Sequence, residues 1–335
     1  MIESTLYEAQ LFMRSGRRFH RARQATQVII FGRNDNCSYS CKTHMNIFQE
    51  YKKTLKDPAV EEFFDLFLFR PFAFLIVKTI RRFPITPNQL SVASMITGIG
   101  SGIFFSLGTK SSFLIGGFLY GFTRVMDCSD GMLARMKNCV TPTGRIVDGI
   151  IDYVNASAVN IGWLIGLFKG AFALPVSPWL LVVPAAFFMG LHSMVVDYYR
   201  MEFLSNGLGK ANSPKDDYAK FTSELDQMKS QKKRRLDEWM IRIYLLYLKT
   251  QLGKTRTKNK YDREAYFRAN RHLLPTWAFI GSSSYIFVLM TSSIIGKPMV
   301  FFCYSIGIAN IWLVMLLVIQ IRTNNKLTRR KDSSS

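Results

Sequence analysis

Four aspartates lie close together in the segment DCSDGMLARMKNCVTPTGRIVDGIIDYV, residues 127–154. Asp127 and Asp130 are three positions apart, and Asp148 and Asp152 are four positions apart, so each pair projects from one face of a helix. A turn with Pro and Gly separates the two expected helices and would let all four carboxylates point toward one place. Carboxylates at that depth in apolar sequence are costly, so they indicate a functional site.

Like charges that converge in a poorly solvated site repel one another, and a bound cation is the simplest way to keep them ionised. Oxygen ligands favour Mg²⁺ or Mn²⁺ over zinc, and no Cys or His stands at the same spacing. We therefore predict a site for Mg²⁺ or Mn²⁺ that is made by Asp127, Asp130, Asp148 and Asp152.

Small residues and one arginine accompany the aspartates. Gly131 and Ala134 lie on or beside the helix face of the first aspartate pair, and Gly144 comes one turn before Asp148. A bulky ligand could therefore approach the backbone here. Arg135 offers planar donors that suit a phosphate oxygen, although it could instead pair with a carboxylate of the motif. The predicted metal site, the space beside the small residues and the guanidinium of Arg135 together indicate a pyrophosphate ligand.

These residues form the pattern D-x2-D-G-x2-A-R-x8-G-x3-D-x3-D, which resembles the hallmark of the CDP-alcohol phosphotransferases, also called CDP-alcohol phosphatidyltransferases, at every fixed position. The resemblance extends over about residues 57–322. It implies a membrane enzyme in which the hydroxyl of an acceptor alcohol attacks the phosphorus that bears the donor's alcohol, with release of CMP. It also implies a homodimer.

The resemblance assigns roles to individual residues. Asp127, Asp130 and Asp148 would bind two metal ions that hold the CDP pyrophosphate. Asp152 would contact the metal cluster or act as the catalytic general base. The nucleotide site would be lined by Gly131, Ala134 and Gly144.

The sequence leaves the substrates open. CDP-diacylglycerol is the favoured donor, with a phospholipid as the product, and the alternative is a nucleotide that carries a small headgroup alcohol or inositol phosphate. The last two apolar stretches hold no Lys or Arg between His272 and Lys297 or between Met299 and Ile321, which favours a neutral or zwitterionic acceptor. A cation transporter is the alternative from another class, but an ion pathway needs no nucleotide-sized space beside an arginine.

Apolar stretches long enough to cross a bilayer dominate the rest of a chain that is 48% hydrophobic. We expect six transmembrane helices in an all-α polytopic membrane protein, at about 88–107, 112–127, 146–168, 177–199, 273–292 and 298–321. Both termini would then lie on one side. The loops on the other side contain only Lys110, Lys169 and Lys297 of the 44 Lys and Arg, so the positive-inside rule puts both termini and the active site in the cytoplasm.

The net charge of +21 is concentrated at these membrane borders, where it sets topology and attracts anionic lipids. We therefore expect membrane lipids, and no nucleic acid, as partners. Five scattered cysteines make no disulfide framework and indicate a reducing compartment. Free thiols are favoured over a zinc site at Cys37, Cys41 and His44, whose spacing matches no standard finger.

The expected organisation is a basic cytoplasmic region at 1–56, an interfacial amphipathic helix at 57–87 and a six-helix domain at 88–322. A cytoplasmic insertion at 201–271 interrupts the domain, and a flexible tail at 323–335 follows it. In the interfacial helix Phe63, Phe67 and Phe74 would enter the acyl boundary, and the alternative is a helix packed on the bundle.

Two further groups of residues are candidates for contact with substrates. The segment ITPNQLS, residues 85–91, is either a helix cap alone or a cap that also touches the nucleotide. His192, Asp197 and Arg200 could reach the acceptor near the end of the fourth apolar stretch. A lone histidine among apolar neighbours is more often a core residue, which is the favoured interpretation of His192.

Overall fold

A computed structural model describes residues 47–55, 61–137, 142–209 and 261–332, with isolated residues between 218 and 245. Every regular element in these ranges is a helix, as the predicted fold class requires. The predicted region 1–56 lies almost wholly outside the described residues, as do most of the insertion and the end of the tail.

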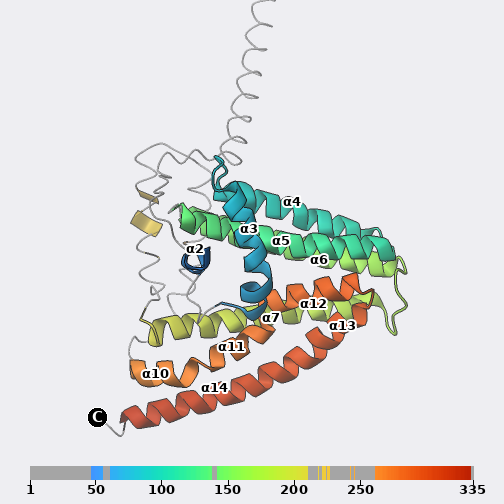
Figure 1. The fold of residues 1–335 in the computed structure, drawn as a ribbon. Helices are drawn as coiled ribbons and strands as arrows, with labels where there is room; N and C mark the ends of the chain where they lie inside the picture. Colours follow the sequence, from blue (N-terminus) through green and yellow to red (C-terminus); the bar gives the residue numbers. More distant parts are fainter. Residues whose placement is uncertain are drawn as a thin grey trace, which may run out of the picture.

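Three long helices run side by side in one part of the molecule (Figure 1). They are α4 (Pro87–Ser106), α5 (Lys110–Met136) and α6 (Pro142–Phe168). Of these, α4 packs against both of the others. The remaining long helices lie beside them, with α12 against α5 and α7 against α6. They are α7 (Pro178–Asn206), α12 (Ser282–Ile294), α13 (Pro298–Phe302) and α14 (Ala309–Asp332).

Shorter elements flank this bundle. α3 packs across α5, and α10 and α11 contact α7. A π-helical turn precedes α3, a second π-helical turn joins α13 to α14, and a 3-10 turn joins α11 to the segment before α12. The bounds are α2 (Ile47–Thr54), the first π turn (Asp65–Phe69), α3 (Arg70–Ile80), α10 (Arg263–Asn270), α11 (Leu273–Trp277), the 3-10 turn (Ala278–Ile280) and the second π turn (Cys303–Ile308).

Four of the described helical segments are long and apolar enough to cross a membrane, and a fifth counts if a pair bent by 42° is one span. The four are Pro87–Ser106, Val147–Phe168, Pro178–Asn206 and Pro298–Arg329, and the bent pair is Leu273–Ile280 with Ser282–Ile294. The predicted second span falls in α5, which is not among them. Its apolar half is rich in glycine and its other half carries charged residues, which lowers its mean hydropathy. Six spans are therefore not confirmed.

Glycines bring α4 and α6 into backbone contact. A Cβ added at Gly102 would overlap the carbonyl of Ala158, and one added at Gly162 would overlap the carbonyl of Gly102. Small residues at this spacing let helices approach closely in apolar surroundings, where packing replaces the hydrophobic effect as the driving force. This contact fixes the distance between the two helices whose ends carry Ser91 and Asp148.

The segment before α4 differs in part from its prediction. Phe63 and Phe67 are 57% and 67% exposed, as an interfacial face requires, but Phe74 is only 5% exposed. The expectation that Phe74 enters lipid is therefore wrong, because that side of α3 packs with Val77 in a cluster that includes residues of α5. Pro71 does not end the helix, since it falls in the first turn of α3, directly after a π-helical turn.

Gly102→Ala should destabilise the protein, because its methyl group would meet the backbone of α6 at a contact that cannot relax by a side-chain rotation. The expected cost is about 1–3 kcal/mol, typical of overpacking. Gly100→Ala is the matched control, since its Cβ would meet nothing within 4 Å. Thermal unfolding in detergent should separate the two variants, and equal midpoints would contradict the glycine-mediated contact.

Candidate active site

Ser91 brings together one carboxylate from each aspartate pair. Its Oγ lies 2.6 Å from Oδ2 of Asp130 and 3.1 Å from Oδ1 of Asp148. Because α4 packs against both α5 and α6, the hydroxyl of Ser91 on α4 reaches one carboxylate on each of these two helices. A hydroxyl has one proton and can donate it to only one acceptor at a time. The hydroxyl of Ser91 can therefore donate either to Asp130, which is buried, or to Asp148, but not to both at once.

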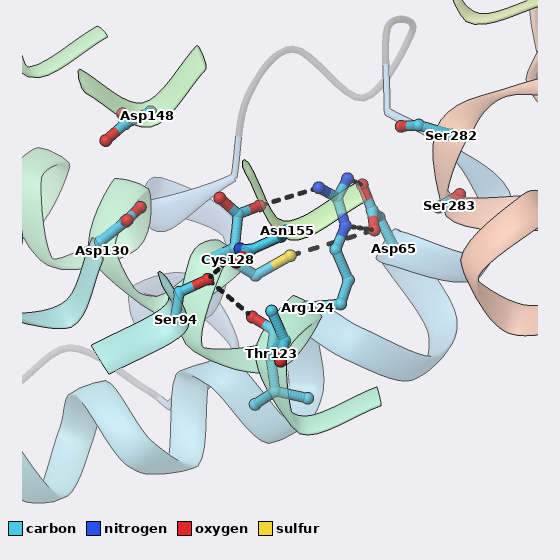
Figure 2. Close-up of polar contacts among 12 residues, drawn as sticks. Asp65, Ser94, Thr123, Arg124, Cys128, Asp130, Asp148, Asn155, Ser282 and Ser283 are labelled. Atoms are coloured by element: carbon cyan, nitrogen blue, oxygen red, sulfur yellow. Dashed lines mark hydrogen bonds and ion pairs between the residues drawn. The ribbon is translucent and has the colours of Figure 1, made fainter. Parts of the chain in front are cut away.

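Asp127 is held by an arginine that also binds a second acidic residue. Nη1 of Arg124 donates to Oδ2 of Asp127 at 2.8 Å. The same guanidinium donates from Nε and Nη2 to the two oxygens of Asp65 at 3.0 and 2.7 Å, a two-pronged contact that Figure 2 shows. The sequence alone did not single out Asp65 or Arg124 as functional residues. The available signal was a charged residue inside an expected membrane span.

Asp152 stands one turn beyond Asp148 on α6, and its side chain is exposed. It is therefore accessible to a substrate, as a general base must be. Within the described residues, no group of three or more His, Cys, Asp or Glu side chains is arranged to hold a metal ion. The structure thus brings Asp130 and Asp148 to one hydroxyl, while Asp127 is directed to Arg124.

The donor set nevertheless fits a hard divalent cation in its chemistry. The ligands available are carboxylate and hydroxyl oxygens, which Mg²⁺ and Mn²⁺ prefer. Asp130 and Asp148 both approach the hydroxyl of Ser91, which brings two negative charges close together, and a cation would be attracted to that place.

The residues expected to line a nucleotide site lie at the end of α5. A Cβ added at Gly131 would meet only the guanidinium of Arg135, with Nη1 at 3.4 Å, so no backbone crowds this position. Nε of Arg135 donates to the carbonyl oxygen of Thr54 at 2.6 Å, which ties the end of α5 to α2. Ala134 directly precedes Arg135 in the sequence and is half-buried. Gly144 on α6 is also half-buried.

The segment 85–91 forms the N-terminal cap of α4 and also reaches the aspartates. Thr86 is the N-cap, with Pro87 at the first helical position and Gln89 completing a capping box. Ser91 follows within the helix and makes the contacts described above. A cap thus fixes the start of α4 and, through it, the height of Ser91 along the helix.

His192 is fully buried, and its Nδ1 lies 2.5 Å from the hydroxyl of Tyr285. This geometry favours the core interpretation over contact with the acceptor. Arg200 donates to Asp197 and to Glu62, each at 2.9 Å.

Glu62 also accepts from the backbone N–H of Ser283 at 2.6 Å, at the start of α12. Burial raises the pKa of Glu62, but Arg200, Arg124 and the contacts with Ser283 outweigh burial and hold this pKa below its usual range. The carboxylate therefore stays charged and clamps α7 and α12 to the segment before α3.

Carboxylates at the ends of apolar helices, beside an arginine and small residues, are typical of a membrane enzyme that acts on phosphate groups. Comparison with known sequences gives the family. Residues 84–214, from the N-cap region of α4 to just beyond α7, match the sequence model of the CDP-alcohol phosphatidyltransferase family. The family resemblance drawn from the aspartate motif is thereby confirmed for this segment, which is shorter than the expected range 57–322. The proteins of this family are transferases of substituted phosphate groups.

A curated relative matches a shorter part of the chain. Over 74 residues, or 22% of the chain, the sequence is 38% identical to the bifunctional IPC transferase and DIPP synthase of Thermococcus kodakarensis. The match spans only 16% of that protein's length.

Ser91→Ala should impair a site that uses Asp130 and Asp148 together. Loss of a group that orients ligating carboxylates costs about 10–100-fold in metal affinity or activity. Ser106→Ala on the same helix is the control, because its exposed hydroxyl bonds only within α4. Transferase turnover at varied Mg²⁺ concentration checks this expectation, and equal turnover for both variants would contradict it.

Proposed function

We propose that the protein transfers a phosphoalcohol group, most specifically a phosphatidyl group, from a CDP-linked donor to an acceptor hydroxyl in phospholipid biosynthesis. The acceptor oxygen forms a bond to the phosphorus that carries the donor's alcohol. The bond from that phosphorus to the bridging oxygen breaks, and CMP leaves with the electron pair. The observation that carries the proposal is the meeting of Asp130 and Asp148 at Ser91, inside the segment that matches the family.

The residues of the motif divide the work. Asp152, which is exposed on α6, takes the proton of the acceptor hydroxyl as that oxygen attacks. Asp127, Asp130 and Asp148 would hold Mg²⁺ or Mn²⁺, two ions in our proposal, and such ions neutralise charge on phosphate oxygens. The space beside Gly131 admits the nucleotide, and Arg135 borders that space.

A lipid donor fits the surroundings of the site. Asp148 and Asp152 lie at the start of a helical segment that is long and apolar enough to cross a membrane, so CDP-diacylglycerol could keep its acyl chains in lipid while its nucleotide reaches the aspartates. A small headgroup alcohol on the nucleotide is the alternative donor. The asymmetry of Lys and Arg supports a cytoplasmic active site, and a homodimer follows the family resemblance.

The direct test is CMP release by the purified protein from a panel of CDP-linked donors and alcohols. We expect turnover with CDP-diacylglycerol that depends on Mg²⁺ or Mn²⁺. Turnover only with a CDP-linked headgroup would move the assignment to the alternative donor, and absence of CMP release with every pair would contradict the proposed function.

Asp152→Asn should separate proton transfer from binding. Because the amide cannot accept the proton, we expect CMP release to fall by about 100-fold or more. CDP binding, measured by calorimetry, should persist in this variant. Asp127→Ala should lose both CMP release and CDP binding. Normal turnover in Asp152→Asn would remove the residue from its role as base.

The acceptor should be a neutral or zwitterionic alcohol. A phosphorylated acceptor needs an uncompensated cation, but Arg200 is already paired with Glu62 and Asp197. We therefore expect free alcohols to support CMP release in a competition assay that also offers inositol phosphate and glycerol phosphate. Activity with the phosphorylated acceptors alone would overturn this expectation.

The segment 61–80 should contact lipid through one face only. Phe63 and Phe67 are exposed, while Phe69 and Val77 are buried. Spin labels placed singly at these four positions should show quenching by a lipid-soluble reagent at the first two and protection at the last two. Protection at all four positions would mean that the segment is buried in protein.

A further inference from the structure

Asp65, Arg124 and Asp127 form a chain of charges from the segment before α3 into the candidate metal site. Figure 2 shows the part of this chain in which Arg124 binds Asp65. The side chains of Asp65, Arg124 and Asp127 are 7%, 14% and 18% exposed, in that order. Poor solvation makes charge interactions stronger than at a protein surface. The contact between Arg124 and Asp65 uses both prongs of the guanidinium, which fixes its direction as well as its distance.

The charges in this chain do not cancel. Arg124 and Asp127 alone would form a neutral pair, and a neutralised carboxylate is a poor ligand for a cation. Asp65 adds a second negative charge to the same guanidinium, so the three residues together carry a net charge of about −1 with all groups ionised. Asp127 thus keeps an orienting hydrogen bond from Arg124 without losing its net attraction for a cation.

The segment that supplies Asp65 is itself anchored. Glu62, one turn earlier, binds Arg200 of α7 and the first turn of α12. Two acidic residues on one turn thus connect α5, α7 and α12. Asp65 cannot move away from Arg124 unless this second set of contacts also breaks.

We propose that Asp65 and Arg124 are positioning residues for Asp127, and that Asp65 preserves the affinity of Asp127 for a divalent cation by compensating the charge of Arg124. This inference rests on the proposed function, because it assumes that Asp127 is a metal ligand. It gives the segment before α3 a part in the chemistry, although that segment lies outside the matched residues 84–214.

The test is Mn²⁺ binding to the purified full chain, followed by electron paramagnetic resonance without substrate. In Asp65→Asn the guanidinium of Arg124 keeps its hydrogen bond to Asp127 but loses the ionised carboxylate of Asp65, so more of its charge acts on Asp127. We expect Mn²⁺ to bind about tenfold more weakly, as for other groups that support a metal ligand. The double variant Asp65→Asn with Arg124→Gln should recover part of that loss, because the competing cation is gone. A merely structural role predicts the opposite, a larger loss in the double variant.

Glu61→Gln is the matched control for the loss of a buried carboxylate on the same segment. Glu61 pairs with Arg70 at 2.8 Å, and their side chains are only 2% and 5% exposed, but this pair does not include Arg124. We expect this variant to bind Mn²⁺ as the wild type does. Thermal unfolding identifies variants that fail to fold. Asp65→Glu keeps the negative charge but shifts the carboxylate relative to the guanidinium of Arg124, so its loss of Mn²⁺ affinity should be smaller than that of Asp65→Asn.

The two proposals fail in different ways. A wild-type protein that binds no Mn²⁺ and releases no CMP would remove the proposed function. A wild-type protein that binds Mn²⁺, with unchanged affinity in Asp65→Asn, would overturn only the role of Asp65 and Arg124. Weaker binding in the double variant than in Asp65→Asn would also overturn the electrostatic role.

Discussion

Asp130 and Asp148 approach the same serine hydroxyl from two different helices, although two carboxylates in a poorly solvated place repel each other. The protein holds them there by geometry. Small residues let α4 and α6 touch at the backbone, and the capping box at Thr86 fixes where α4 begins. The concentration of negative charge that results would suit the binding of cations, as we propose for this site.

Two arginines near the site, Arg124 and Arg200, are each paired with two acidic residues. Arg124 contacts Asp127 but is shared with Asp65, and Arg200 is shared between Glu62 and Asp197. Each guanidinium is thus shared between two carboxylates, so neither carries an uncompensated positive charge that would hold an additional phosphate. The segment before α3 supplies the acidic partner in both cases, so it belongs to the electrostatics of the site as well as to its outer surface.

The aspartate motif and the helical class followed from the sequence because i, i+3 and i, i+4 spacing and long apolar stretches are local signals. Ser91 could be placed only near a cap, since its contacts with Asp130 and Asp148 depend on how three helices pack. The pairing of Asp65 with Arg124 joins residues 59 positions apart, which no local pattern encodes. The expected second span is not confirmed, because glycines and charged residues lower the mean hydropathy of α5.

The most direct measurement is the location of Mn²⁺ in crystals of the protein grown with CDP, by anomalous scattering at the manganese edge. The account predicts anomalous peaks about 2.1 Å from carboxylate oxygens of Asp127, Asp130 and Asp148, with the pyrophosphate bound to the same ions and Asp152 at their border. Peaks at other side chains, or a nucleotide bound away from the ends of α5 and α6, would contradict it.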